Sequence, residues 1–202
     1  MNFLIICRRL IVSLCILIPF LPLNDAFGIR LTLVKHLFDI TQNFKEPSDV
    51  AVSRDGMIYV VDGVNNKIKV FNQNGKFAFS FGEKGAANGE FKFPLGIYVD
   101  GYNKVYVADS GNQRVQIFNS SGSFINQIKV PSKNGSVSDP TDVVSDLSLK
   151  TLYVVDNNNH CILAFNMPSG QLRETYGGPG EGDREFRYPF LITRDNDDYL
   201  YI

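Results

Sequence analysis

The sequence contains no tryptophan and only three cysteines in 202 residues. Cys7 and Cys15 lie in the apolar N-terminal segment, which leaves Cys161 alone in the body of the chain and excludes a disulfide framework. The absence of Trp removes the propeller repeats that this residue marks. Sixteen Phe and nine Tyr favour β structure instead.

Neither sign of charge dominates the composition. The formal net charge is -1 and the isoelectric point is about 6.1, so the chain has no basic field to attract phosphate backbones. We therefore expect no nucleic acid partner. With 44% hydrophobic and 20% charged residues, the chain has the composition of a globular protein rather than a disordered one.

Residues 1–28 have the features of a secretory signal peptide. Positive charge at Arg8 and Arg9 precedes an apolar run over residues 10–23, which is shorter than the roughly 20 residues that a spanning helix needs. The tripeptide Ala26-Phe27-Gly28 then supplies small residues for cleavage, after its alanine or its glycine. We expect a secreted, periplasmic or extracellular protein without a stable membrane span. The alternative is an uncleaved N-terminal anchor with the body facing outward.

One pattern recurs through the rest of the chain. Each unit begins at a proline, and successive prolines are 47, 46 and 49 residues apart. A shared strand pattern, Tyr-Val-(Val/Ala)-Asp, recurs within the whole units. We place the signal peptide at 1–28 and the repeat region at 29–202, with repeats at 47–93, 94–139, 140–188 and a partial repeat at 189–202.

Each unit contains four short apolar segments separated by turn residues. In the first unit the expected strands are 49–53, 57–61, 67–71 and 77–81, and the turns between them contain Gly and Asn. Four strands per unit make one blade of a β-propeller. One blade cannot cover both of its apolar faces, so the sequence predicts an all-β fold in which neighbouring blades pack together.

A second motif leads into the third strand of each unit. It reads Asp62-x-x-Asn65-Asn66-Lys67-Ile68 in the first unit and recurs around Asp109 and Asp156. This pattern, with Gly-rich connectors at 82–94 and 177–189, resembles the NHL repeat family. The resemblance implies a six-bladed β-propeller of four antiparallel strands per blade, of which this chain carries about 3.5 repeats. Lys67 and Cys161 depart from the family's usual Arg, and the connector 131–139 lacks the Gly pattern.

The number of repeats is smaller than the resemblance implies. Leu31-Thr32-Leu33-Val34 looks like the fourth strand of a blade whose other strands are absent. We expect an N-terminal fragment of a longer propeller, or a chain that self-associates to close the ring.

The recurring polar residues of the motif allow two interpretations. Equivalent carboxylates in a ring of blades can bind a metal or act as acids and bases. A structural role is favoured, because an aspartate before an Asn turn accepts backbone N–H bonds and every blade needs them. We assign this structural role to Asp62, Asn65, Asp109, Asn112, Asp156 and Asn159.

No catalytic or metal-binding set is predicted. His36 and His160 stand at nonequivalent repeat positions, and Cys161 adjoins His160 in a segment where neighbouring side chains point to opposite faces. The acidic run 195–198 occupies a hairpin turn and lacks the ligand spacing of a calcium loop. We therefore expect no cofactor.

The resulting functional hypothesis is an exported binding or scaffold module for a protein or a small molecule. Specificity is expected in loops at the blade ends, since loops vary while the blade frame cannot. The candidate positions are Lys84, Asn112, Lys133, Glu181 and Arg184. The alternative, which rests on the resemblance, is a metal-dependent lyase or lactonase-like enzyme whose active site is completed by further blades.

Overall fold

The computed structural model describes residues 36–133, 135–195, 197 and 199–202. The expected signal peptide, residues 1–28, and the expected strand at 31–34 lie outside the described residues. The chain divides into two compact units, Met1–Leu37 and Phe38–Ile202, and every described strand belongs to the second. In the part of the chain that is described, no helix has the length and apolar character to cross a bilayer.

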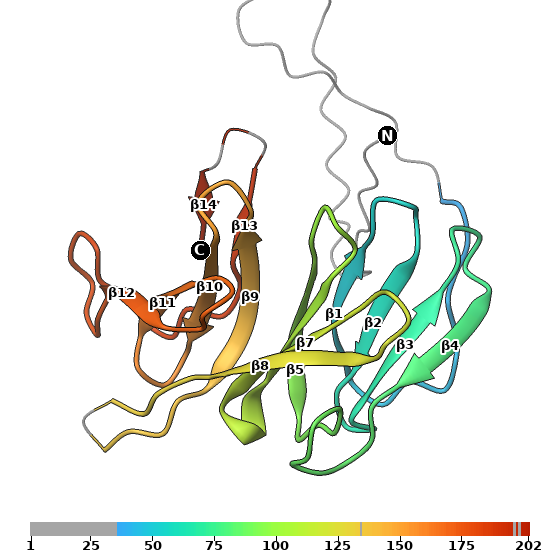
Figure 1. The fold of residues 1–202 in the computed structure, drawn as a ribbon, viewed down its shortest axis with the longest axis horizontal. Coiled ribbons are helices and arrows are strands. Elements are labelled where there is room, and N and C mark those ends of the chain that lie inside the picture. The colour runs from blue at the N-terminus through green and yellow to red at the C-terminus, as the bar shows by residue number, and fades with distance from the viewer. Residues whose placement is uncertain (1–35, 134, 196, 198) are drawn as a thin grey trace, which may run out of the picture. The chain divides into compact units, whose positions relative to one another are not determined.

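The second unit is built from three four-stranded antiparallel blades and a short hairpin (Figure 1). Within each blade the strands follow one another in chain order. The only helical element in the described part is the single turn η1, Ser110–Asn112. The prediction of an all-β propeller of four-stranded blades is confirmed. The strands are β1 (Pro47–Val52), β2 (Ile58–Asp62), β3 (Lys67–Phe71), β4 (Phe77–Phe81), β5 (Pro94–Val99), β6 (Val105–Asp109), β7 (Arg114–Phe118), β8 (Phe124–Lys129), β9 (Pro140–Asp146), β10 (Thr151–Asp156), β11 (Cys161–Asn166), β12 (Leu172–Gly177), β13 (Thr193–Arg194) and β14 (Leu200–Tyr201).

The hairpin turns are closed by short polar side chains. Asn72 Oδ1 accepts hydrogen bonds from the backbone N–H groups two and four residues later, at 3.0 and 3.1 Å. Asp100, Asn119 and Asp195 accept the same pair of bonds in their own turns. A carboxylate or amide oxygen reaches these donors without strain, which explains the Asn and Asp between the strand segments.

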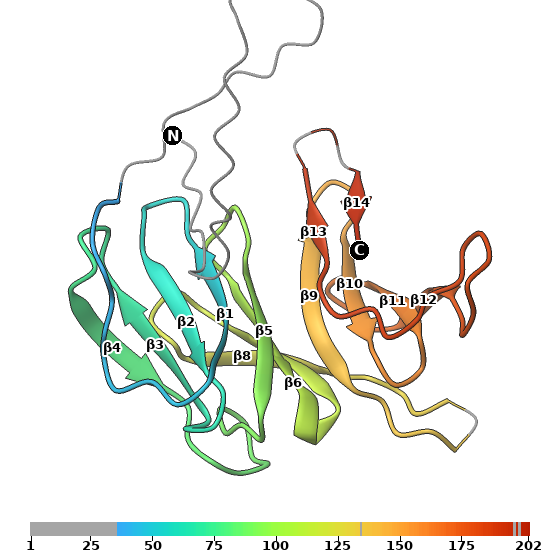
Figure 2. The same ribbon diagram turned by 180° about the vertical axis from the view of Figure 1, so that it is seen from behind.

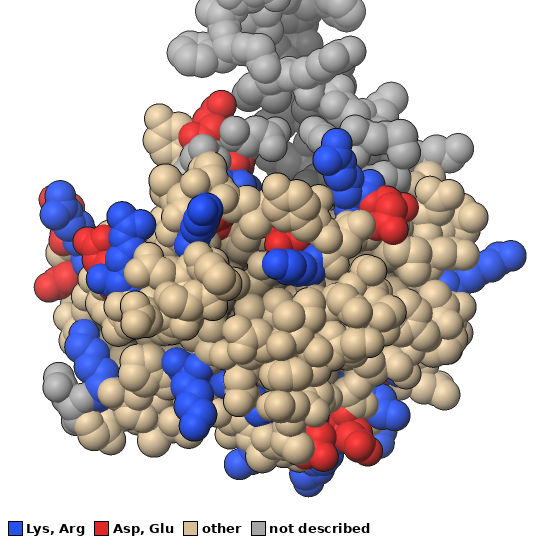
Figure 3. Space-filling model, viewed as in Figure 1, with Lys and Arg blue, Asp and Glu red and all other residues tan. Residues whose placement is uncertain are grey.

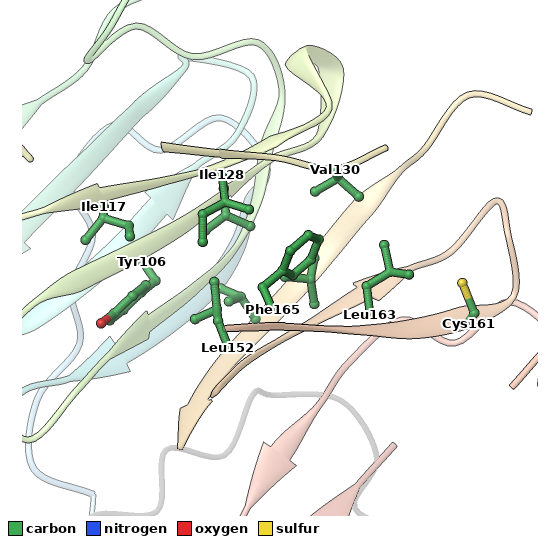
Figure 4. Packing of buried hydrophobic residues seen from close by; sticks show 11 residues of the cluster. Tyr106, Ile117, Ile128, Val130, Leu152, Cys161, Leu163 and Phe165 are labelled. Carbon is green, nitrogen blue, oxygen red and sulfur yellow. The ribbon is translucent and has the colours of Figure 1, made fainter. Parts of the chain in front are cut away.

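The blades pack side by side through their apolar faces. The strands β1, β5, β9 and β13 lie next to one another in this order, so each is the inner strand of its blade (Figures 1 and 2). Figure 4 shows the core between the second and third blades, where Tyr106 and Ile117 face Leu152 and Phe165. Each such side chain is buried, which is worth about 1.5–3 kcal/mol apiece.

Each of the Gly-rich connectors carries a Phe whose ring packs closely against the glycine at the start of that connector. Phe91 is fully buried, and a Cβ on Gly82 would lie 2.4 Å from its ring. Gly177 bears the same relation to Phe186, at 2.3 Å, and both glycines have φ of +88°. Glycine is required at both positions because a side chain would collide with the ring and is disfavoured at this φ.

Candidate functional site

The inner strands line a groove of about 550 Å³. This volume lies within the range of roughly 300–1,000 Å³ that is typical of small-molecule sites. Its walls are mostly β-branched and aromatic. The lining residues are Asp49, Val50, Ala51 and Val52 from β1, Ile97, Tyr98 and Val99 from β5, Asp142, Val143 and Val144 from β9, and Leu191, Ile192, Thr193, Tyr201 and Ile202 from the β13–β14 segment.

Two carboxylates in this groove tie neighbouring blades together. Asp49 accepts the N–H of Val50 at 2.7 Å through Oδ1 and the N–H of Ile97, on the next inner strand, at 2.7 Å through Oδ2. Asp142 makes the same two bonds, to Val143 at 2.8 Å and to Ile192 at 2.8 Å. Each carboxylate therefore satisfies one donor on its own blade and one on the blade that follows.

Glycine replaces this aspartate in the second blade. Gly96 stands two residues after Pro94, as Asp49 and Asp142 stand two residues after their own prolines. A Cβ at Gly96 would lie 2.5 Å from the carbonyl oxygen of Thr141 and 2.6 Å from Asp142 Oδ1. The absence of a side chain thus lets β5 and β9 approach each other closely.

Burial raises the pKa of both carboxyl groups in the groove. Burial raises the pKa of Asp142 to about 7, the negative charge of Asp49 adds to this rise, and the two backbone donors work against it. Burial also raises the pKa of Asp49. The groove therefore combines apolar walls with a carboxyl group that changes its charge near neutral pH.

The repeated aspartates occupy a different place, at the ends of β2, β6 and β10. Asp109 Oδ1 accepts the N–H of Lys92, in the incoming connector, at 2.8 Å, and Oδ2 accepts from the side chain of Asn112 at 2.9 Å. Asp62 has the same partners in Lys45 and Asn65, and Asp156 has them in Asp139 and Asn159. All three aspartates are buried. They hold the turn and the connector to the blade.

The residue that follows the Asn turn, beside each of these aspartates, differs between blades. Arg114 donates to Asp109 in the second blade, at 2.7 Å. In the first blade the equivalent Lys67 is exposed, and Lys69, two residues later on the same face of β3, binds Asp62 at 2.7 Å. Burial opposes ionisation of Asp62, but hydrogen bonds from Asn65, Lys69 and the backbone of Lys45 outweigh it and lower its pKa. In the third blade Cys161 takes the position of Arg114.

Comparison with protein-family models identifies the family of this propeller. A family model described as 6-bladed beta-propeller matches residues 41–144, and an NHL repeat model matches residues 138–165. The chain belongs to the six-bladed β-propeller family. No curated protein matches the sequence.

Solved structures share this propeller fold at low sequence identity. Virginiamycin B lyase from Staphylococcus aureus, in a catalytically inactive variant with quinupristin, has a TM-score of 0.61 and 18% identity over 81% of this chain and 50% of the lyase. Kuenenia stuttgartiensis hydrazine synthase has a TM-score of 0.58 and 14% identity over 78% of this chain and 42% of that one. A Bacteroides caccae protein of unknown function has a TM-score of 0.56 and 13% identity over 81% and 54%. The propeller described here spans about half the length of these proteins.

The five blade-end positions expected to bind ligand lie outside the groove. Lys84, Lys133, Glu181 and Arg184 are exposed on connectors between blades of the propeller. Asn112 is instead hydrogen-bonded within the protein: its amide donates to Asp109 at 2.9 Å and to the carbonyl oxygen of Gly85 at 2.8 Å. Asn112 thus contacts the connector that carries Lys84, and Glu181 and Arg184 share the connector after the third blade. On the face drawn in Figure 3, lysine and arginine side chains stand apart without merging into one basic surface.

The groove aspartates were missed at the sequence level. Asp49 and Asp142 share a repeat position, but Gly96 breaks the series, and a comparison of repeats emphasises what all units share. The available signal was the offset of two residues from the proline that opens each unit. Among the described residues, no three His, Cys, Asp or Glu side chains are grouped to hold a metal ion.

Proposed function

We propose that this protein is an exported binding module whose ligand occupies the groove between the inner strands. The observation that carries the proposal is the groove itself, about 550 Å³ of largely apolar lining drawn from β1, β5, β9 and the β13–β14 segment. Ligand sites in proteins are typically concave and apolar, with a few placed polar groups. Here Asp49 and Asp142 are such groups, and they favour a ligand that joins an apolar body to a hydrogen-bond donor.

Export is the second part of the proposal and rests on residues 1–28. The charge at Arg8 and Arg9 and the apolar run after it support an N-terminal signal. Expression of the full chain in a secreting host should yield a mature protein that begins at Phe27 or Ile29, as measured by mass spectrometry of its N-terminal peptide. Recovery of the uncleaved chain in the membrane fraction would favour the anchor instead.

A tryptophan reporter tests the groove directly, because the natural sequence has no Trp. Val52 is 38% exposed and lines the groove, whereas Phe77, on β4, is 49% exposed and lies outside it. The Val52→Trp and Phe77→Trp proteins would be screened by fluorescence against a library of small amphiphilic molecules. We expect hits that change the emission of the first protein alone. Hits that act equally on both, or on the second alone, would contradict the groove as the site.

The blade-end loops give a competing location for the same function. Lys84, Lys133, Glu181 and Arg184 are exposed, so charge reversal at these positions should leave the fold intact. Ligands found with the Val52 reporter should bind these variants with unchanged affinity if the groove is the site. A loss of binding in K84E or R184E would move the site to the connectors.

A lyase or lactonase-like enzyme is the second candidate, and one observation favours it. Asp142, whose pKa is raised to about 7, faces a groove and has Asp49 nearby, which suits a general acid or base. Two of the solved propellers described above are a lyase and a synthase by name. Turnover of a groove ligand that is lost in D142N and D49N, with ligand binding retained, would establish the enzyme.

A further inference from the structure

Two equivalent backbone contacts close the connectors onto the blades that precede them. In the first blade Asn66 Oδ1 accepts the N–H of Phe93 at 2.8 Å, and in the third blade His160 Nδ1 accepts the N–H of Tyr188 at 3.1 Å. All four residues have positive φ, between 49° and 54°. Phe93 and Tyr188 each stand directly before the proline that opens the next unit. The hydrogen-bond acceptor is therefore an amide oxygen in the first contact and an imidazole nitrogen in the second.

The two acceptors differ in their response to protons. An amide oxygen accepts at any ordinary pH. Imidazole accepts at Nδ1 only while neutral, with its proton on Nε2, and imidazolium carries N–H groups on both nitrogens. Histidine is also the side chain whose ordinary titration falls between pH 5 and 8.

We propose that His160 is a proton-sensitive latch that holds the connector 178–188 onto the third blade. When the imidazole gains a proton, its Nδ1–H faces the N–H of Tyr188, the hydrogen bond is lost, and the end of the connector is released. The half-buried ring also lies 4.4 Å from the ring of Tyr188, so both contacts bear on the same residue. The latch depends on these contacts alone and holds whether or not the groove takes a ligand.

The charged groups on the elements around His160 have partners of their own. Asp156, before the turn, accepts from Asn159, and on the connector Glu185 accepts the N–H of Gly182 while Glu181 pairs with Arg187. The connector also carries Asp183, Arg184 and the Tyr188 hydroxyl, and Cys161, which follows His160 in the chain, lies within the electrostatic influence of Asp156 and Lys133. The connector 178–188 carries three acids, Glu181, Asp183 and Glu185, and two bases, Arg184 and Arg187. The acceptor-exchange variants described below therefore separate the proton on His160 from the charge of the connector, which they leave unchanged.

Amide hydrogen exchange of the full chain, resolved by NMR, tests the latch at a single residue. Protection of the Tyr188 amide, corrected for intrinsic exchange, should fall roughly three- to tenfold from pH 7.5 to pH 5.0, the equivalent of one ordinary hydrogen bond. The Phe93 amide is the internal control and should keep its protection. Equal pH dependence at the two amides would overturn the proposal.

Two variants exchange the acceptors. H160N should make protection at Tyr188 independent of pH, as at Phe93, and N66H should make protection at Phe93 depend on pH, as at Tyr188. If H160N retains the pH dependence of Tyr188, another group is responsible and the latch is disproved. The comparison of Tyr188 with Phe93 in the natural protein decides the matter even if a variant fails to fold.

Discussion

Arg114 donates its Nε–H to Asp109 Oδ2 at 2.7 Å, and the two side chains are only 6% and 0% exposed. A buried ion pair that loses one partner leaves a charge without compensation, at a cost of about 3–5 kcal/mol. We therefore predict that R114L lowers the free energy of unfolding by about this amount. Urea unfolding of the purified protein measures it.

The control for this substitution comes from the first blade. Lys67 holds the repeat position of Arg114 but is exposed, and Lys69 binds Asp62 instead. K67M should change the free energy of unfolding by no more than about 0.5 kcal/mol, as expected of an exposed position. A cost of K67M equal to that of R114L would show that the repeat position, and not the buried contact, determines stability.

The ionisation of Asp142 should make stability depend on pH. Its folded pKa of about 7 lies above the ordinary 3.8, because of burial and then the charge of Asp49, so the folded state keeps a proton that the unfolded state releases. The stability from this carboxyl is present near pH 4 and is lost as the pH rises through about 7. In D142N the side chain at this position does not titrate, so this pH-dependent contribution to stability is absent.

Urea unfolding of both proteins at pH 4.5 and pH 7.5 isolates this effect. The stability of the natural protein relative to D142N should decrease as the pH rises. Asp62 and Asp146, whose pKa values are lowered, act in the opposite direction but equally in both proteins. A relative stability that stays constant or increases would argue against the raised pKa of Asp142.

The close approach of β5 and β9 depends on Gly96. In G96A the new methyl group would meet the Thr141 carbonyl and Asp142 at 2.5–2.6 Å, so the strands must separate, at about 1–3 kcal/mol. Gly178 is the matched control, since a Cβ there meets nothing within 4 Å. Thermal unfolding should show a lower Tm for G96A and an almost unchanged one for G178A. Similar Tm values for the two variants would mean that β5 and β9 are not packed this tightly.

Cys161 should be unreactive while the protein is folded. Burial raises the pKa of its thiol to about 11, and the charge of Asp156 contributes, so the nucleophilic thiolate is scarce at pH 8. Iodoacetamide at pH 8 should label the Cys161 peptide in urea but not in native buffer, as quantified by mass spectrometry. Rapid native labelling would indicate an opened third blade.

The repeat architecture could be read from the sequence because its causes are local. In the first blade, alternating apolar residues and Asn or Gly turns predict strand bounds within two residues of those observed, and the strands 67–71 and 77–81 have the predicted bounds. The Asp62 and Asp109 motifs recur at fixed spacing because each blade needs the same turn. Such features require no knowledge of which blades are neighbours.

Contacts between units could not be read in this way. Lys67 and Lys69 lie on the same face of β3, and only the folded structure shows that Lys69 is the one that binds Asp62. The order of residues in the sequence does not distinguish between the two lysines. The bond from the Ile192 N–H to Asp142 joins residues 50 positions apart, across two blades. The groove, and the role of His160 as an acceptor, exist only once the blades are assembled.

We propose that the groove between the inner strands binds a ligand. The direct measurement is hydrogen–deuterium exchange of the natural protein with and without a molecule selected through the Val52 reporter. We predict slower exchange in β1, β5 and β9, with the connectors 82–93 and 177–188 unchanged. Protection confined to those connectors, or absent from the inner strands, would contradict ligand binding in the groove.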